Sequence, residues 1–244
     1  MVQKIGNLIL FGFMIVMNYL ANALPLNNKT TGQLSDEYPN LFVPTGLTFS
    51  IWGVIYLLIL IFCIIQFFQS NRETIRSIGW LFSLSCVLNG LWIVAWHYQN
   101  LPLSLLLMVG LLIVLIFINQ KISSLPFGLI KAAFGIYLGW ICIASIANVT
   151  ALLVYYGWGA WGISELVWTV LLIVVGLLIS SVTLIRFQNP FLGLVVAWAF
   201  LGIALKRQAD EPMIFFVALG AMVLVLFVAG AGFFPKKIPI RFGK

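Results

Sequence analysis

The chain has 244 residues, of which 63% are hydrophobic and only 8% are charged. Soluble globular domains are about half apolar and about a quarter charged, so this composition excludes an ordinary soluble domain and indicates a polytopic membrane protein. The net charge of +7 would suit a nucleic-acid binder. The basic residues lie between apolar segments, however, where they orient a membrane protein, and no nucleic-acid partner is expected.

The first apolar segment, at residues 5–24, allows two interpretations. A lysine, an apolar run and then Ala21-Asn22-Ala23 also suit a signal peptide that is cleaved. The apolar run is long for a signal peptide, so we favour a retained first helix.

Seven further apolar segments approach the roughly 20 residues that a helix needs to cross about 30 Å of hydrocarbon. Prolines and short polar clusters separate them. The sequence therefore predicts an all-α fold, that of a polytopic α-helical membrane protein. The eight predicted spans are residues 5–24, 46–69, 77–97, 102–120, 128–156, 163–185, 190–205 and 212–234.

The longest predicted outer connection, residues 25–45, contains Pro25, Pro39 and Pro44. Loops of this length in a compact bundle more often bind or cover a site than act as tethers. We therefore expect a lid or binding loop here.

Polar and aromatic residues share faces on the second and third predicted helices. Trp52 and Tyr56 are one turn apart, and Asn89, Trp92 and Trp96 follow at i, i+3 and i+7. Residues with these spacings lie on one helix face. An Asn in hydrocarbon needs a hydrogen-bond partner, so these faces should point toward other helices.

The fifth predicted helix repeats this pattern, with Trp140, Ala144 and Asn148 at i, i+4 and i+8. Two interpretations remain open for the three helices. Their faces line a ligand pocket, or they hold the helices together, because Asn commonly bonds between membrane helices and Trp is common at membrane interfaces.

The basic residues predict the orientation of the chain. If the N-terminus is cytoplasmic, three basic residues, Lys29, Lys206 and Arg207, lie outside. An excess of Lys and Arg in cytoplasmic loops is typical of membrane proteins. We therefore expect both termini in the cytoplasm and the membrane to be a bacterial cell membrane. The other ten of the 13 basic residues then lie inside: Lys4, Arg72, Arg76, Lys121, Lys131, Arg186, Lys236, Lys237, Arg241 and Lys244.

The sequence predicts neither a disulfide framework nor a metal site. Its three cysteines, Cys63, Cys86 and Cys142, lie within apolar segments, and it has one histidine, His97. Structural zinc sites use four Cys or His ligands, so we expect no metal ligands and no required cofactor. Nucleotide-binding loops and hydrolase motifs are absent from the sequence, and an enzyme function is the less favoured interpretation.

Three motifs resemble the TspO/translocator protein family, also called tryptophan-rich sensory proteins or peripheral benzodiazepine receptors. The fifth helix of that family reads P-Y-x-x-W-x-x-[FY]-A-x-x-x-N, and residues 137–148 fall into its register. Its third-helix motif L-N-x-x-W matches residues 88–92, and its second-helix motif W-x-x-L-Y resembles residues 52–56. The resemblance covers about residues 1–156.

The sequence also departs from the family pattern. Ile136 and Ser50 stand where the family has prolines, and beyond residue 160 the resemblance offers no counterpart for the last three helices. The chain therefore resembles an extended, divergent member of the family. We expect a TspO-like five-helix bundle over residues 1–156 and a three-helix extension with a basic cytoplasmic tail over residues 157–244. The extension is either an added part of the bundle or a module that forms a homodimer.

The resemblance implies a pocket that opens to the outside beneath the first loop. It implies a hydrophobic planar ligand, a tetrapyrrole such as protoporphyrin IX or haem, or a sterol, and a role as a sensor or regulator in the lipid bilayer. The alternatives are a secondary transporter of such a ligand and light-dependent porphyrin breakdown that involves Trp140. The candidate ligand-binding residues are Trp52, Tyr56, Asn89, Trp92, Tyr137, Trp140, Ala144 and Asn148.

Overall fold

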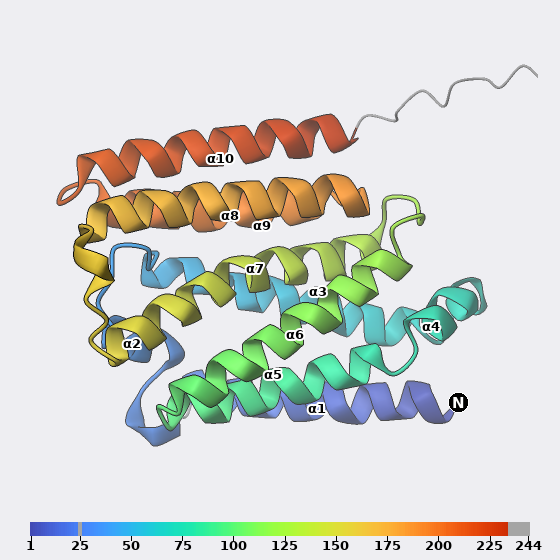
Figure 1. Ribbon diagram of the computed structural model, residues 1–244. Coiled ribbons are helices and arrows are strands. Elements are labelled where there is room, and N and C mark those ends of the chain that lie inside the picture. The colour runs from blue at the N-terminus through green and yellow to red at the C-terminus, as the bar shows by residue number, and fades with distance from the viewer. Residues whose placement is uncertain (24–25, 234–244) are drawn as a thin grey trace, which may run out of the picture.

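Long helices form the body of the protein in the computed structural model, which describes residues 1–23 and 26–233 (Figure 1). Within these residues there is no strand, and the predicted all-α fold is confirmed. The long helices are α1 (Val2–Asn22), α3 (Ile51–Ile65), α5 (Leu81–His97), α6 (Leu101–Lys121), α7 (Leu129–Tyr155), α8 (Glu165–Phe187), α9 (Phe191–Arg207) and α10 (Pro212–Phe233). Shorter helices lie in the connections: η1 (Leu26–Asn28), α2 (Thr31–Asp36), η2 (Gly46–Ser50), η3 (Gln69–Asn71), α4 (Arg72–Ile78) and η4 (Ala160–Gly162).

Each predicted span contains one of these helices, but the prediction of eight independent spans is not confirmed. Six stretches in the described residues have the length and hydropathy of a membrane span. A seventh is the pair Gln69–Ile78 and Leu81–His97, which is bent by 62°. The remaining helix, α9, has 17 residues, which corresponds to roughly 25 Å. The six stretches are α1, Gly46–Ile65 (η2 with α3), α6, α7, α8 and α10.

The bend before α5 has a local cause at Gly79. This residue has φ +60°, a conformation that side chains with a Cβ rarely adopt. It ends α4, and α5 starts two residues later in a new direction. The third predicted span, residues 77–97, therefore begins with a break and not with a continuous helix.

The long helices run side by side and alternate in direction (Figure 1). The N-terminus, α4 and the connections α6–α7 and α8–α9 lie at one end of the bundle, which we call the inner end. The connections α1–α3, α7–α8 and α9–α10 lie at the outer end. The described basic residues predicted inside belong to segments of the inner end, whereas Lys236, Lys237, Arg241 and Lys244 lie outside the described residues. Which end faces the cytoplasm stays a prediction.

Helix α7 lies at the centre of the bundle and packs against α3, α6, α8 and α9. Its close contact with α9 depends on glycine, because a Cβ on Gly139 would lie 2.7 Å from the Leu192 carbonyl oxygen. Asn189, just before α9, donates to the Asn119 side chain on α6 and to the Lys131 carbonyl on α7, both at 2.9 Å. The C-terminal helices are thus packed directly onto the helix that carries much of the predicted site.

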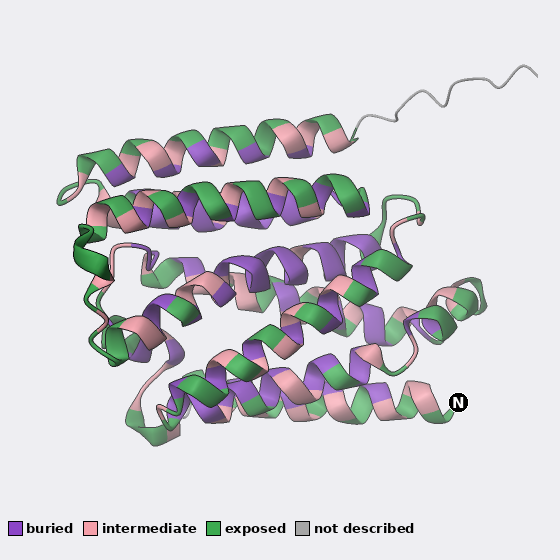
Figure 2. Cartoon of the chain, viewed as in Figure 1, coloured by how far each residue is buried: buried purple, intermediate pink, exposed green. Residues whose placement is uncertain are grey.

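The burial of each helix follows from its place in the bundle (Figure 2). Helix α7 is buried along most of its length, whereas α10 and α1 each have one exposed face. The exposed face of α10 carries large apolar side chains, such as Phe216 and Phe227. An apolar outer surface is what a bilayer requires of a membrane-spanning helix.

Candidate functional site

Aromatic residues predicted for the site gather around Trp52 in the middle of the bundle. Its ring stacks on that of Tyr56, with the centroids 5.4 Å apart. The Trp92 and Trp140 rings both lie 6.2 Å from it, and the Tyr137 ring lies 6.0 Å from it. Helices α3, α5 and α7 thus present their predicted faces to one another, as the helical spacing indicated.

The polar atoms beside this cluster bond to one another. The Tyr56 hydroxyl donates to Asn18 Oδ1, and Asn18 Nδ2 donates to Asn89 Oδ1 at 2.8 Å. Asn89 Nδ2 in turn donates to the Tyr137 hydroxyl at 3.0 Å. This network joins α1, α3, α5 and α7, so these polar groups hold helices together.

A small cavity of about 40 Å³ lies next to the aromatic cluster, between α5, α7 and the first outer connection. We call residues 26–50 of that connection the lid. Helix α5 contributes Trp92 and Trp96 to the cavity wall. The lid contributes Thr31, Ser35, Pro44 and Phe49, and α7 contributes Trp140, Ile143, Ala144, Ala147 and Asn148.

The cavity brings together only part of the predicted set. Trp92, Trp140, Ala144 and Asn148 line it, whereas Trp52, Tyr56, Asn89 and Tyr137 belong to the adjoining cluster. Whether either group binds a ligand stays a prediction.

Of the lid residues that line the cavity, the sequence marked Pro44 as one of the loop prolines but did not single out the others. Thr31 and Ser35 lie in the loop at residues 25–45, which shows no helical or strand periodicity, and Phe49 lies near the start of the predicted span 46–69. Trp96 shares the stripe of Asn89 and Trp92, and that spacing was the available signal.

Three residues of the cavity wall carry buried polar atoms that have no hydrogen-bond partner among the described residues. They are Nε1 of Trp92, Nε1 of Trp140 and Oγ1 of Thr31. Asn148, by contrast, is paired with Ser104 on α6, and Trp96 Nε1 donates to the Thr31 carbonyl at 3.4 Å. Because an unsatisfied buried donor costs about 1–3 kcal/mol, two unpaired indole N–H groups at one cavity call for a molecule with hydrogen-bond acceptors.

After η1, the lid continues with a well-capped short helix, α2. Thr30 and Gln33 form a reciprocal cap. The backbone N–H of Gln33 donates to Thr30 Oγ1 at 3.2 Å, and the backbone N–H of Thr30 donates to Gln33 Oε1 at 2.8 Å. The ring of Tyr38 then lies 5.9 Å from that of Trp96. Burial raises the pKa of Tyr38 above its ordinary value, and the nearby Glu37 carboxylate raises it further, so the phenol stays neutral.

The described residues contain no group of three or more His, Cys, Asp and Glu side chains that could hold a metal ion. His97 is buried at the outer end of α5, where its Nδ1 lies 2.9 Å from the Ile93 carbonyl oxygen, and it does not line the cavity.

Comparison with models of known protein families shows which family the chain belongs to. The model of the TSPO-like protein family matches residues 4–231. The chain belongs to this family. Searches among curated proteins and among solved structures found no match. The family match continues through α8, α9 and α10, beyond the residues 1–156 that the motifs had marked. The chain is thus a multi-pass membrane protein of the TspO type, and its C-terminal helices lie within the matched region.

Proposed function

We propose that this TSPO-like protein binds a flat, hydrophobic molecule with hydrogen-bond acceptors at its edge, and that it acts as a sensor or regulator. A tetrapyrrole such as protoporphyrin IX has this chemistry. The observation that carries the proposal is the pair of buried, unpaired indole N–H groups of Trp92 and Trp140 at one cavity.

The chemistry of the cavity wall supports this ligand class. The indole rings of Trp92, Trp96 and Trp140 offer flat apolar faces that suit stacking on a planar macrocycle. The two free N–H groups suit carboxylate or carbonyl oxygens at its edge. A sterol has an acceptor hydroxyl but no aromatic face, and it therefore uses less of this wall.

The size of the cavity adds a condition. Its volume of about 40 Å³ is far below the roughly 300–1,000 Å³ typical of ligand pockets. Because one side of the cavity is made by the lid, the ligand enters by displacing residues of the lid, which leaves the wall of α5 and α7 in place.

The proposal is tested by titrating the purified protein with protoporphyrin IX and following porphyrin absorbance. Wild type should bind saturably. Trp140→Phe and Trp92→Phe each remove one N–H group but keep an aromatic ring. Each should weaken binding about 5- to 30-fold, since one hydrogen bond to a charged or buried partner contributes about 1–2 kcal/mol.

The matched control is Trp161→Phe, at an exposed tryptophan on the outer connection η4. It should bind as wild type does. Equal affinity in all four proteins would contradict the proposed site, because it would mean that the porphyrin partitions into the detergent or onto the apolar surface.

A further inference from the structure

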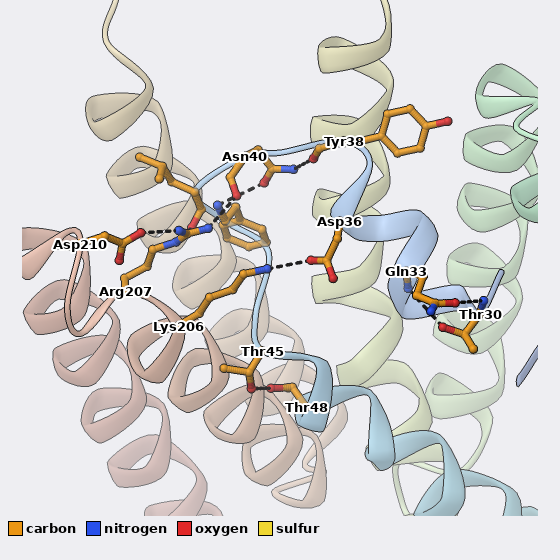
Figure 3. Close-up of polar contacts among 12 residues, drawn as sticks. Thr30, Gln33, Asp36, Tyr38, Asn40, Thr45, Thr48, Lys206, Arg207 and Asp210 are labelled. Atoms are coloured by element: carbon orange, nitrogen blue, oxygen red, sulfur yellow. Dashed lines mark hydrogen bonds and ion pairs between the residues drawn. The ribbon is translucent and has the colours of Figure 1, made fainter.

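The lid is fastened to the C-terminal helices by one arginine at the outer end of α9 (Figure 3). Arg207 Nε donates to the Leu41 carbonyl at 3.2 Å, and its Nη2 donates to the Asn40 carbonyl at 3.0 Å. Its third nitrogen, Nη1, donates to the Asp210 carboxylate at 2.7 Å. The side chain of Arg207 is only 12% exposed. A planar guanidinium that bonds two successive carbonyls fixes the backbone of the lid at that point.

One ion pair and one hydrogen bond to a carboxylate lie beside this arginine. Lys206 Nζ lies 3.0 Å from Asp36 Oδ1 at the end of α2. The Leu41 amide donates to the Glu165 carboxylate at the start of α8, at 2.8 Å. Charged groups from α8 and α9 therefore hold the lid between Asp36 and Leu41.

The lid is also bonded to α9 farther along the chain. The Thr45 amide donates to the Gly202 carbonyl at 3.2 Å, and Trp198 Nε1 donates to the Thr48 carbonyl at 3.0 Å. Gly202 permits this contact, because a Cβ at that position would collide with the Thr48 side chain. Over residues 40–48, the hydrogen bonds from the lid to other described elements all go to α8 or α9.

This stretch closes part of the cavity, and Thr31 and Ser35 of the earlier lid close the rest. Pro44 lies within it and Phe49 follows it directly, and both line the cavity. The earlier part of the lid contacts α5 through Trp96 and Gln99, and it contacts α9 through the pair of Asp36 with Lys206. Helix α9 thus holds residues 40–48 and the end of α2, whereas α5 holds the residues on either side of Asp36.

We propose that Arg207 and Lys206 form a latch, which keeps residues 36–48 of the lid closed over the cavity and which must release before a ligand enters. The identity of the ligand rests on the proposed function, but the latch does not. The closed cavity is too small for a tetrapyrrole, so such a ligand binds only the open state. A weaker latch leaves more molecules open, and the ligand then binds faster and more tightly.

The test measures hydrogen–deuterium exchange of the full chain in lipid nanodiscs, in peptides that cover residues 38–48. Arg207→Ala should speed exchange there about ten-fold or more, since it removes two charge-assisted hydrogen bonds to the lid. Arg207→Lys should have an intermediate effect, because an ammonium group does not reproduce the planar fork. Arg186→Ala, at the inner end of α8, is the matched control and should not change it.

The Lys206–Asp36 pair gives a second test that does not depend on Arg207. Lys206→Asp and Asp36→Lys should each speed exchange a few-fold, and the two together should restore the wild-type rate. The effect is smaller because the Asp36 side chain is 65% exposed. Unchanged exchange in Arg207→Ala, or no restoration in the double variant, would overturn the latch.

The same variants are titrated with protoporphyrin IX. Arg207→Ala should associate about ten-fold faster and bind more tightly than wild type, the opposite direction to Trp140→Phe. If Arg207→Ala exchanges faster but wild type binds no porphyrin, the latch is supported and the proposed function is contradicted. If wild type binds porphyrin but exchange in Arg207→Ala is unchanged, the proposed function is supported and the latch is contradicted.

Discussion

At the scale of single residues, Asn18 shows how a polar group in a bilayer becomes a structural joint. It is buried on α1, accepts a hydrogen bond from Tyr56 and donates to Asn89 and to the Met14 carbonyl. Each polar side-chain atom in this network has at least one partner from the protein. The network therefore differs from the neighbouring cavity, where Trp92 and Trp140 each keep a free N–H group.

We predict that Asn18→Leu destabilises the protein by about 1–3 kcal/mol, because the Tyr56 hydroxyl and Asn89 Oδ1 lose their partner. Thermal unfolding in detergent measures this as a lower midpoint. Gln120→Leu is the control, since the Gln120 side chain is exposed and makes no hydrogen bond among the described residues. Equal midpoints for both variants would show that the network adds little stability.

At the scale of helices, the contact between α7 and α9 decides where the C-terminal half of the protein lies. Gly139 brings the backbones together, and the neighbouring Gly135 leaves room for the Asn189 side chain. Small residues spaced four apart allow membrane helices to approach in this way. The position of α9 in turn places Arg207 and Gly202 against the lid.

We predict that Gly139→Ala destabilises the protein, by about 1–3 kcal/mol, because the new methyl group would meet the Leu192 carbonyl oxygen, which belongs to backbone and cannot turn away. Gly53→Ala is the matched control. Gly53 also lies within a helix, α3, but a Cβ there meets nothing within 4 Å, so this change should be neutral or slightly stabilising. Thermal unfolding and size-exclusion chromatography report both outcomes. An unchanged unfolding midpoint in Gly139→Ala would refute the close packing of α7 against α9.

At the scale of the whole molecule, the two ends of the bundle differ in charge and in role. The inner end carries most of the described basic residues, whereas the outer end carries the lid, the latch and the acidic residues that pair with it. The excess of basic residues predicts that the inner end faces the cytoplasm.

Cysteine labelling in intact cells tests this orientation, and the native cysteines do not interfere because all three are buried. Ala209→Cys, in the α9–α10 connection, should react with a membrane-impermeant maleimide. Ser124→Cys, in the α6–α7 connection, should react only after the membrane is permeabilised. Both positions are exposed, so the reverse pattern would mean that the chain is inserted the other way.

The sequence predicted the parts of this fold that follow a period. Apolar runs located the helices, and three- and four-residue spacing placed Trp52, Trp92 and Trp140 on facing sides. It failed where contacts depend on tertiary position. The lid residues Thr31 and Ser35 follow no period. Residues 190–205 read as a span, whereas α9, with 17 residues, is not among the stretches that have the length and hydropathy of one.

Under the proposed function, the fastening of the lid to α9 would also set how much ligand the protein needs before it responds. A closed lid acts as a competitor that is part of the same chain, present at a fixed and high effective concentration. The ligand concentration at half-response is then the intrinsic dissociation constant of the Trp-lined wall divided by the fraction of molecules that are open. Exchanging residues at the end of α9 would shift that threshold without altering a single side chain on α5 or α7 that touches the ligand.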